Sequence, residues 1–174
     1  MLDRWKDPNE LKANHDEALI LLDAMGVVRV EDESEKSYVK LFLFPIFQVL
    51  KQEIEKTELS SIFLFFPEDQ TGDMAEWDGV CFRHDCNKQI YSIGLAIPAL
   101  HISCDYAVML IIHELCHMFY NDESNRAFFR HMDDLLDRYN RATNSNVIND
   151  YSETSLKYDS AGRVGRLRRY TTKE

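Results

Sequence analysis

The stretch that decides the fold is YAVMLIIHELCH, which runs from Tyr106 to His117. Its first seven residues are apolar and its last five form an HExxH sequence. An apolar run before a polar motif predicts a helix that is buried on all sides. His113 and His117 lie four residues apart, so on a helix they project about 40° from each other and can reach one metal ion. Glu114 lies beside them, where a carboxylate can act on a metal-bound water. Buried imidazoles need a reason to be in a core, and this favours a metal site over two chance histidines.

The composition describes an ordinary globular chain. The 174 residues, 45% apolar and 29% charged, fit one domain over 1–174 with a sizeable core. No apolar run approaches the roughly 20 residues that cross a bilayer, and the first residues lack a hydrophobic signal segment. We therefore expect a soluble cytoplasmic protein. The four cysteines form no paired CxxC motifs and are expected to be reduced thiols. The net charge of −10 argues against nucleic acid as a partner.

Two helices are predicted in the first third of the chain. Asp7 and Glu10 fit a capping box, and apolar residues at helical spacing follow until Gly26. A second helix is expected from a cap at Asp32 to about Thr57. Pro45 falls inside it and should kink or split it.

A β region comes next. Ser61–Phe66 is short and aromatic, which predicts a buried strand. Gly79–Arg83 and Gln89–Ile97 are predicted to form a hairpin, and residues 68–78 a loop. In the last of these strands bulky and small residues alternate, so one face can approach other groups closely.

The HExxH helix is expected over about 105–120, followed by an amphipathic helix that includes 128–139. Residues 157–174 form a basic and possibly frayed tail. Together these elements predict an α+β fold.

A catalytic zinc takes three protein ligands and leaves one position open, so a third ligand is needed. Glu123 is the first choice, because it lies six residues after His117, just past the expected helix end. The chain can turn there and bring the carboxylate back toward the two histidines. The alternatives by ligand type are Asp122, His131, and an upstream thiolate from Cys81 or Cys104.

The motif region, residues 89–139, resembles the SprT-like and WLM groups of zincin metallopeptidases. The resemblance comes from the strand pair, the HELCH helix, and Ser124 followed by the aromatic pair Phe128 and Phe129. It implies a zincin-like fold, in which a small antiparallel or mixed sheet packs against the HExxH helix and further helices. In the WLM-like pattern the position of Glu123 usually holds a histidine, so the carboxylate implies either an altered coordination shell or a different ligand. The glycine that metzincins carry is replaced here by Tyr120.

The resemblance implies a zinc-dependent peptidase acting on a protein or peptide substrate. Glu114 would be the general base that activates the metal-bound water, and it would not be a ligand. The strand Gln89–Ile97 would bind an extended substrate by edge pairing. The donors that could stabilise the oxyanion are Tyr120, His131, Tyr151 and Tyr158. SprT-like proteins are associated with cleaving DNA-bound proteins, a role that the acidic charge of this chain argues against.

Two other functions fit the same motif. One is a non-peptide amide hydrolase of the deformylase kind, which a cysteine ligand such as Cys81 would favour. The other is a binding or regulatory module with a structural or vestigial zinc, in which protein atoms fill the fourth coordination position.

Overall fold

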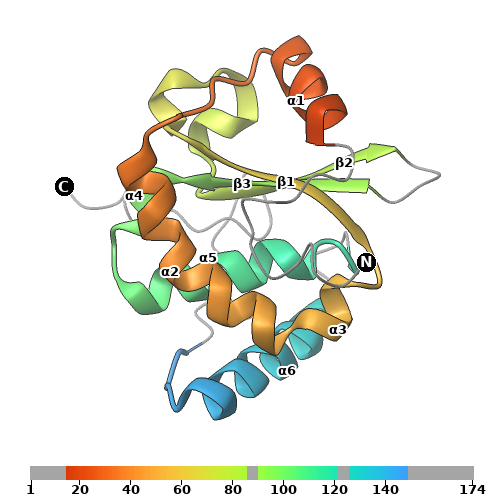
Figure 1. Ribbon diagram of the computed structural model, residues 1–174, viewed down its shortest axis with the longest axis vertical. Helices are drawn as coiled ribbons and strands as arrows, with labels where there is room; N and C mark the ends of the chain where they lie inside the picture. The colour runs from red at the N-terminus through yellow and green to blue at the C-terminus, as the bar shows by residue number, and fades with distance from the viewer. Residues whose placement is uncertain (1–14, 86–89, 121–125, 149–174) are drawn as a thin grey trace.

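The computed structural model describes residues 15–85, 90–120 and 126–148 (Figure 1). The expected capping box at Asp7 and Glu10 lies outside these residues, as do Asp122, Glu123 and the basic tail 157–174. Within them the fold is mixed α and β, as predicted, with a small mixed sheet and several helices.

The sheet has three strands, which are β1 (Glu58–Phe65), β2 (Gly79–Asp85) and β3 (Ile90–Ala96). Their order is β1-β3-β2, with β1 parallel and β2 antiparallel to β3. The predicted hairpin of β2 and β3 is therefore confirmed. The prediction that β3 pairs with a substrate through its edge is wrong, because β1 and β2 occupy both of its sides. Among the described strands, β1 and β2 are the two outer ones.

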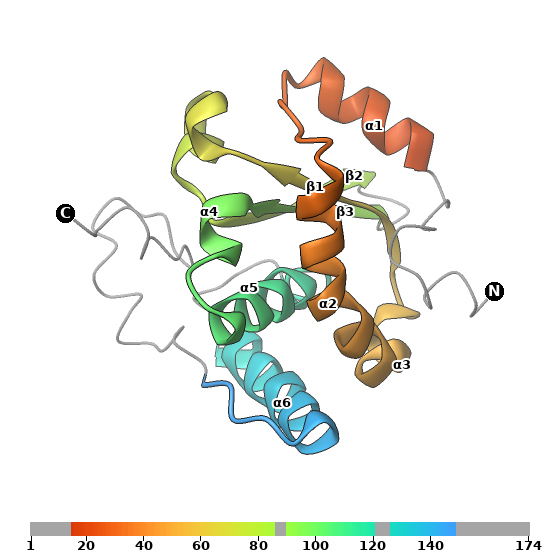
Figure 2. The same ribbon diagram turned by 60° about the vertical axis from the view of Figure 1, so that its left-hand side comes forward.

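Helices cover both faces of the sheet (Figures 1 and 2). On one side lie α1 (His15–Ala24) and two 3-10 turns at Pro67–Asp69 and Gly72–Glu76. The opposite side holds α5 (Cys104–Cys116), with its neighbours α2 (Glu33–Val49), α3 (Lys51–Ile54) and α6 (Arg126–Thr143). The short α4 (Ile97–Leu100) connects β3 to α5.

The predicted stop signal of α1 and the predicted start signal of α2 are confirmed. Gly26, with φ of +73°, follows the end of α1, where a side chain would be strained. The Asp32 side chain caps α2 by accepting from the backbone N–H groups of Ser34 (2.8 Å) and Glu35 (3.2 Å). Pro45 does not split α2, which ends only at Val49. Pro45 removes the helical bond to the carbonyl of Leu41, and Leu41 lies on the solvent side with 68% of its surface exposed.

The HExxH helix α5 is the most deeply buried helix of the fold. Its side chains from Tyr106 to Cys116 are all buried, as the apolar run predicted. Ser103 caps its start by accepting from the backbone N–H of Tyr106 at 3.0 Å. The regular helix ends at Cys116, four residues earlier than predicted, and 117–120 continue as tight turns. No helix among the described residues combines the length and the apolar character needed to cross a membrane.

Candidate metal centre

The last turn of α5 brings its two histidine rings together. The Nε2 atoms of His113 and His117 are 3.1 Å apart, and the ring planes meet at 82°. Two imidazoles on one tetrahedral zinc, each at 2.0–2.1 Å, would hold their nitrogens about 3.3 Å apart. The pair is therefore spaced as two ligands of one ion would be. His113 is fully buried and His117 is half-buried.

Phe128 supports both rings from α6. Its ring centroid lies 5.0 Å from that of His113 and 4.8 Å from that of His117, and the side chain is fully buried. The thiol of Cys116 donates a hydrogen bond to the carbonyl of Phe128 at 3.5 Å, which joins α5 to α6 at this point. An aromatic ring packed against both imidazoles limits their rotation and excludes water from that side. The sequence indicated Phe128 only as a member of an apolar stripe and an aromatic pair.

Glu114 lies against the bare backbone of β2. It is 3% exposed, and a Cβ added at Gly79 would come within 2.6 Å of its Oε1 and 2.9 Å of its Cδ. Real side chains do not approach so closely, so the position of this carboxylate requires glycine at residue 79. From the sequence Gly79 was noted only as the start of a strand, although a strand glycine does signal a close approach.

A buried hydrogen bond fixes the start of β2 against α5. The hydroxyl of Tyr106 donates to Asp78 Oδ2 at 2.5 Å, and the two residues are 3% and 1% exposed. The carbonyl of Asp78 also accepts from the backbone N–H of Ala96 at 2.8 Å. Asp78 thus ties β2 to both α5 and β3 and sets where its neighbour Gly79 lies. Sequence reasoning did not identify this pair.

Cys81 lies two residues along β2 from Gly79, on the same side of the strand. Burial raises the pKa of its thiol well above the ordinary value, and the charge of Glu114 raises it further.

Among the described residues, no third His, Cys, Asp or Glu joins the two histidines in a group that could hold a metal. The ring of His131 packs instead on Phe119 and Tyr120, with centroid distances of 5.1 and 5.3 Å. Cys104 begins the same helix, nine residues before His113, which is about 13 Å along its axis. The preferred ligand Glu123 and its alternative Asp122 lie outside the described residues, so the choice of Glu123 stays a prediction.

The proposed oxyanion donors are not distinguished by this geometry. Tyr120 and His131 contact each other, and Tyr151 and Tyr158 lie outside the described residues.

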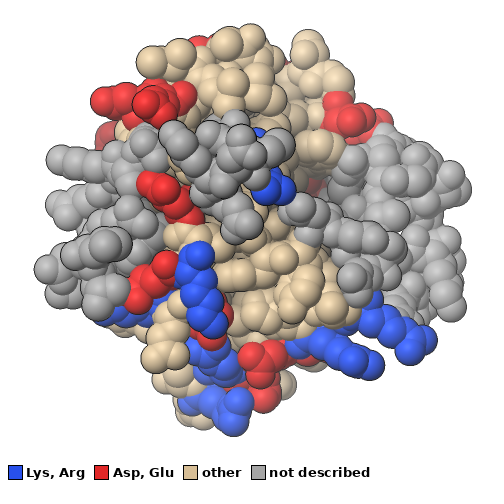
Figure 3. Space-filling model, turned by 90° about the vertical axis from the view of Figure 1, so that its right-hand side faces the viewer, with Lys and Arg blue, Asp and Glu red and all other residues tan. Residues whose placement is uncertain are grey.

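Acidic and basic side chains lie interspersed on the face seen from the right-hand side of Figure 1 (Figure 3). The described residues visible there form no continuous basic area of the kind that phosphate backbones require.

Comparison of the chain with protein-family models, curated proteins and solved structures gives no match. What the chain does is therefore inferred from the residues of this site.

Proposed function

We propose that the chain is a zinc-dependent peptidase of zincin type. The observation that supports this most strongly is the 3.1 Å convergence of the His113 and His117 Nε2 atoms, with the carboxylate of Glu114 in the same helical turn. Burying a carboxylate and two imidazoles costs free energy unless these groups are paired or coordinate a metal ion.

The spacing of the two histidine nitrogens suits two of the three protein ligands of a zinc ion. The two Nε2 atoms would hold it, and Glu123 is the predicted third ligand. When bound, zinc supplies a Lewis acid that brings the pKa of a water toward neutrality and polarises a carbonyl. Phe128 keeps the two imidazoles oriented toward the same point.

Glu114 is the proposed general base. The glycine at position 79 leaves room for its carboxylate, so an Oε atom can take a proton from water and later deliver it to the leaving amine. The hydrogen bond between Asp78 and Tyr106 acts on this step indirectly, because it holds β2 at the distance that Glu114 requires.

The proposed place for an extended substrate is the outer edge of β2. This strand is at the edge of the sheet, and its residues Gly79 and Cys81 lie beside Glu114. An edge strand offers unpaired backbone groups to a peptide, which would give affinity with little demand on its side chains. The role that the sequence indicated for β3 thus passes to β2.

The deciding experiment compares Glu114→Gln with the wild-type chain, using a quenched fluorescent peptide library as substrate. Hydrolysis should fall at least about 100-fold, as for loss of a general base, while the zinc content stays the same. Glu68→Gln is the matched control, since it makes the same charge change at an exposed position away from the site.

Three results would contradict the proposal. Equal hydrolysis by wild type and Glu114→Gln would exclude Glu114 as the base. A wild-type chain that binds zinc and cleaves no peptide would favour the binding module, and cleavage of formylated amides alone would favour the deformylase-like hydrolase.

A further inference from the structure

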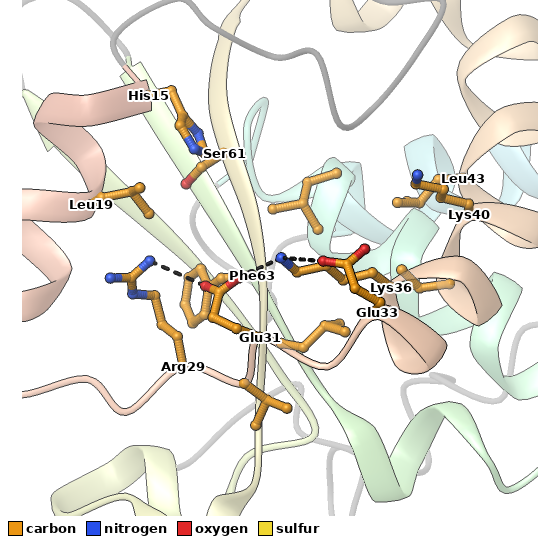
Figure 4. Close-up of a pocket in the computed structure, with 14 residues that line it drawn as sticks. His15, Leu19, Arg29, Glu31, Glu33, Lys36, Lys40, Leu43, Ser61 and Phe63 are labelled. Carbon is orange, nitrogen blue, oxygen red and sulfur yellow. Dashed lines mark hydrogen bonds and ion pairs between the residues drawn. The ribbon is translucent and has the colours of Figure 1, made fainter.

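A cavity of about 320 Å³ lies at the other edge of the sheet, beside β1 (Figure 4). We call it the edge pocket. It is enclosed by α1, residues 29–31, α2 and β1. Its volume is within the range of ligand-binding pockets. The apolar residues that line it are Leu19, Val30, Val39, Leu43, Ile62, Phe63 and Leu64.

The backbone of β1 is open toward this pocket. Val30, which is not part of the sheet, donates its N–H to the carbonyl of Leu64 at 2.8 Å. The backbone groups of Leu64 therefore point away from β3. Backbone groups alternate along a strand, and those of Ile62 therefore point the same way. Among the described residues, none outside the sheet bonds to the backbone of Ile62. An N–H and a carbonyl are thus available at the pocket.

Residues 28–30 already lie along part of the outer edge of β1. The side chain of Gln70 holds this segment by accepting from the Val28 N–H at 3.1 Å and donating to the Val28 carbonyl at 2.6 Å. The segment passes Leu64 at Val30 and then turns away into α2 after Glu31. The edge pocket begins where the pairing of Val30 with Leu64 stops. An extended peptide in the pocket would therefore continue backbone pairing along the same edge of β1.

Lys40 differs from the other lysine and arginine residues that line the pocket. Arg29 forms ion pairs with Asp23 at 2.8 Å and with Glu31 at 3.6 Å. Lys36 pairs with Glu31, and with Glu33 at 3.6 Å (Figure 4). Lys40 lines the pocket one helical turn after Lys36 and has no ion-pair partner among the described residues. A cation without a partner at the pocket favours a ligand that carries an acidic group.

We propose that the edge pocket binds an extended acidic peptide segment of another protein. The peptide backbone hydrogen-bonds to the backbone of Ile62. One of its apolar side chains packs among the apolar residues that line the pocket, and an Asp or Glu side chain forms an ion pair with Lys40. Strands lie about 4.8 Å apart, so β1 and β2 are about 10 Å apart across β3, and this site is separate from the HExxH site. The proposal does not depend on the peptidase function.

The test is selection of a random heptapeptide display library on the immobilised full-length protein. We expect enrichment of sequences in which an Asp or Glu accompanies alternating apolar residues. Synthetic copies should bind the wild-type chain and lose at least tenfold in affinity to Lys40→Glu. Lys51→Glu is the matched control and should bind them unchanged. Ile62→Pro, which removes only an N–H that points away from β3, should also weaken binding.

Other outcomes would overturn the proposal. No enrichment, or equal affinity for wild type and Lys40→Glu, would exclude an acidic peptide. Selected sequences that match residues 1–14 would assign the pocket to this chain or a second copy of it, and not to another protein. If Ile62→Pro unfolds early in a thermal scan, the Lys40→Glu comparison decides alone.

Discussion

Residue 79 is a glycine, and its lack of a side chain lets Glu114 lie against β2. The helical spacing of the motif was enough to predict that His113 and His117 converge, because three residues of intervening helix fix their geometry. The sequence could not predict Gly79 beneath Glu114 or the bond from Tyr106 to Asp78. These contacts join segments far apart in the chain, the second across 28 residues, and only the packing of β2 on α5 creates them.

The first prediction concerns Gly79→Ala. The added methyl overlaps Glu114 Oε1, so we expect a loss of about 1–3 kcal/mol in the free energy of unfolding and a large loss of peptide hydrolysis, with zinc retained. Shortening the carboxylate in Gly79→Ala/Glu114→Asp should restore much of the stability. Urea unfolding of the single and double variants measures the coupling.

Gly94→Ala is the control for this prediction. A Cβ there would meet the ring of Phe63 at 2.5 Å, a clash of similar size on the neighbouring strand. It should also destabilise the chain, but Glu114→Asp should not rescue it. Equal rescue of both glycine variants, or none of Gly79→Ala, would show that Glu114 does not depend on residue 79.

At the scale of the elements, α6 supports the proposed metal centre, because its Phe128 contacts both histidine rings. The end of α1 and the start of α2 could be predicted from the sequence, because the glycine at residue 26 and the cap at Asp32 act locally. A kink or a split was expected at Pro45, but α2 continues to Val49 and α3 begins at Lys51. The missing hydrogen bond at Pro45 falls on the exposed side of α2, where it is tolerated. At its end, α5 bonds to α6 through Cys116 and the carbonyl of Phe128, a contact that local sequence does not encode.

The second prediction concerns Phe128→Leu. Leucine keeps most of the apolar volume but loses the flat surface that contacts both imidazoles, so zinc affinity should fall about 10–100-fold, as for other residues that orient metal ligands. Competition with a fluorescent zinc chelator measures this. Phe129→Leu, at the neighbouring aromatic residue, is the control and should change zinc affinity far less.

The third prediction concerns the ion pair between Glu53 of α3 and Arg138 of α6. Burial alone would raise the pKa of Glu53, but the hydrogen bond and charge of Arg138 outweigh it and hold the pKa below the ordinary 4.5. A lowered pKa means that the pair stabilises the fold above about pH 4.5 and that this contribution is lost as the pH falls through the folded-state pKa.

Arg138→Met should therefore reduce stability at neutral pH by about 1 kcal/mol, and the difference from wild type should shrink on acidification. Urea unfolding from about pH 6 to about pH 3 checks both statements. A difference that stays constant over this range would mean that Arg138 acts through packing and not through the charge of Glu53.

At the scale of the whole molecule, the two proposed sites lie at the two outer strands of the sheet. The HExxH helix lies by β2, and the edge pocket lies by β1. Strand positions and the hairpin could be predicted from local pattern and turn signals. The parallel pairing of β1 with β3 could not, because it depends on which elements cover the sheet after β1. That pairing moved the expected substrate edge from β3 to β2.

The most direct test of the account is to locate the metal. The purified chain, saturated with zinc and freed of excess, should contain one zinc per molecule, and an anomalous difference map should place it between the Nε2 atoms of His113 and His117. His113→Ala should lose it, and the same map names the third ligand, which we predict to be Glu123. A chain that takes up no zinc, or whose ion lies away from these two nitrogens, would contradict the proposed metal centre and the peptidase function with it.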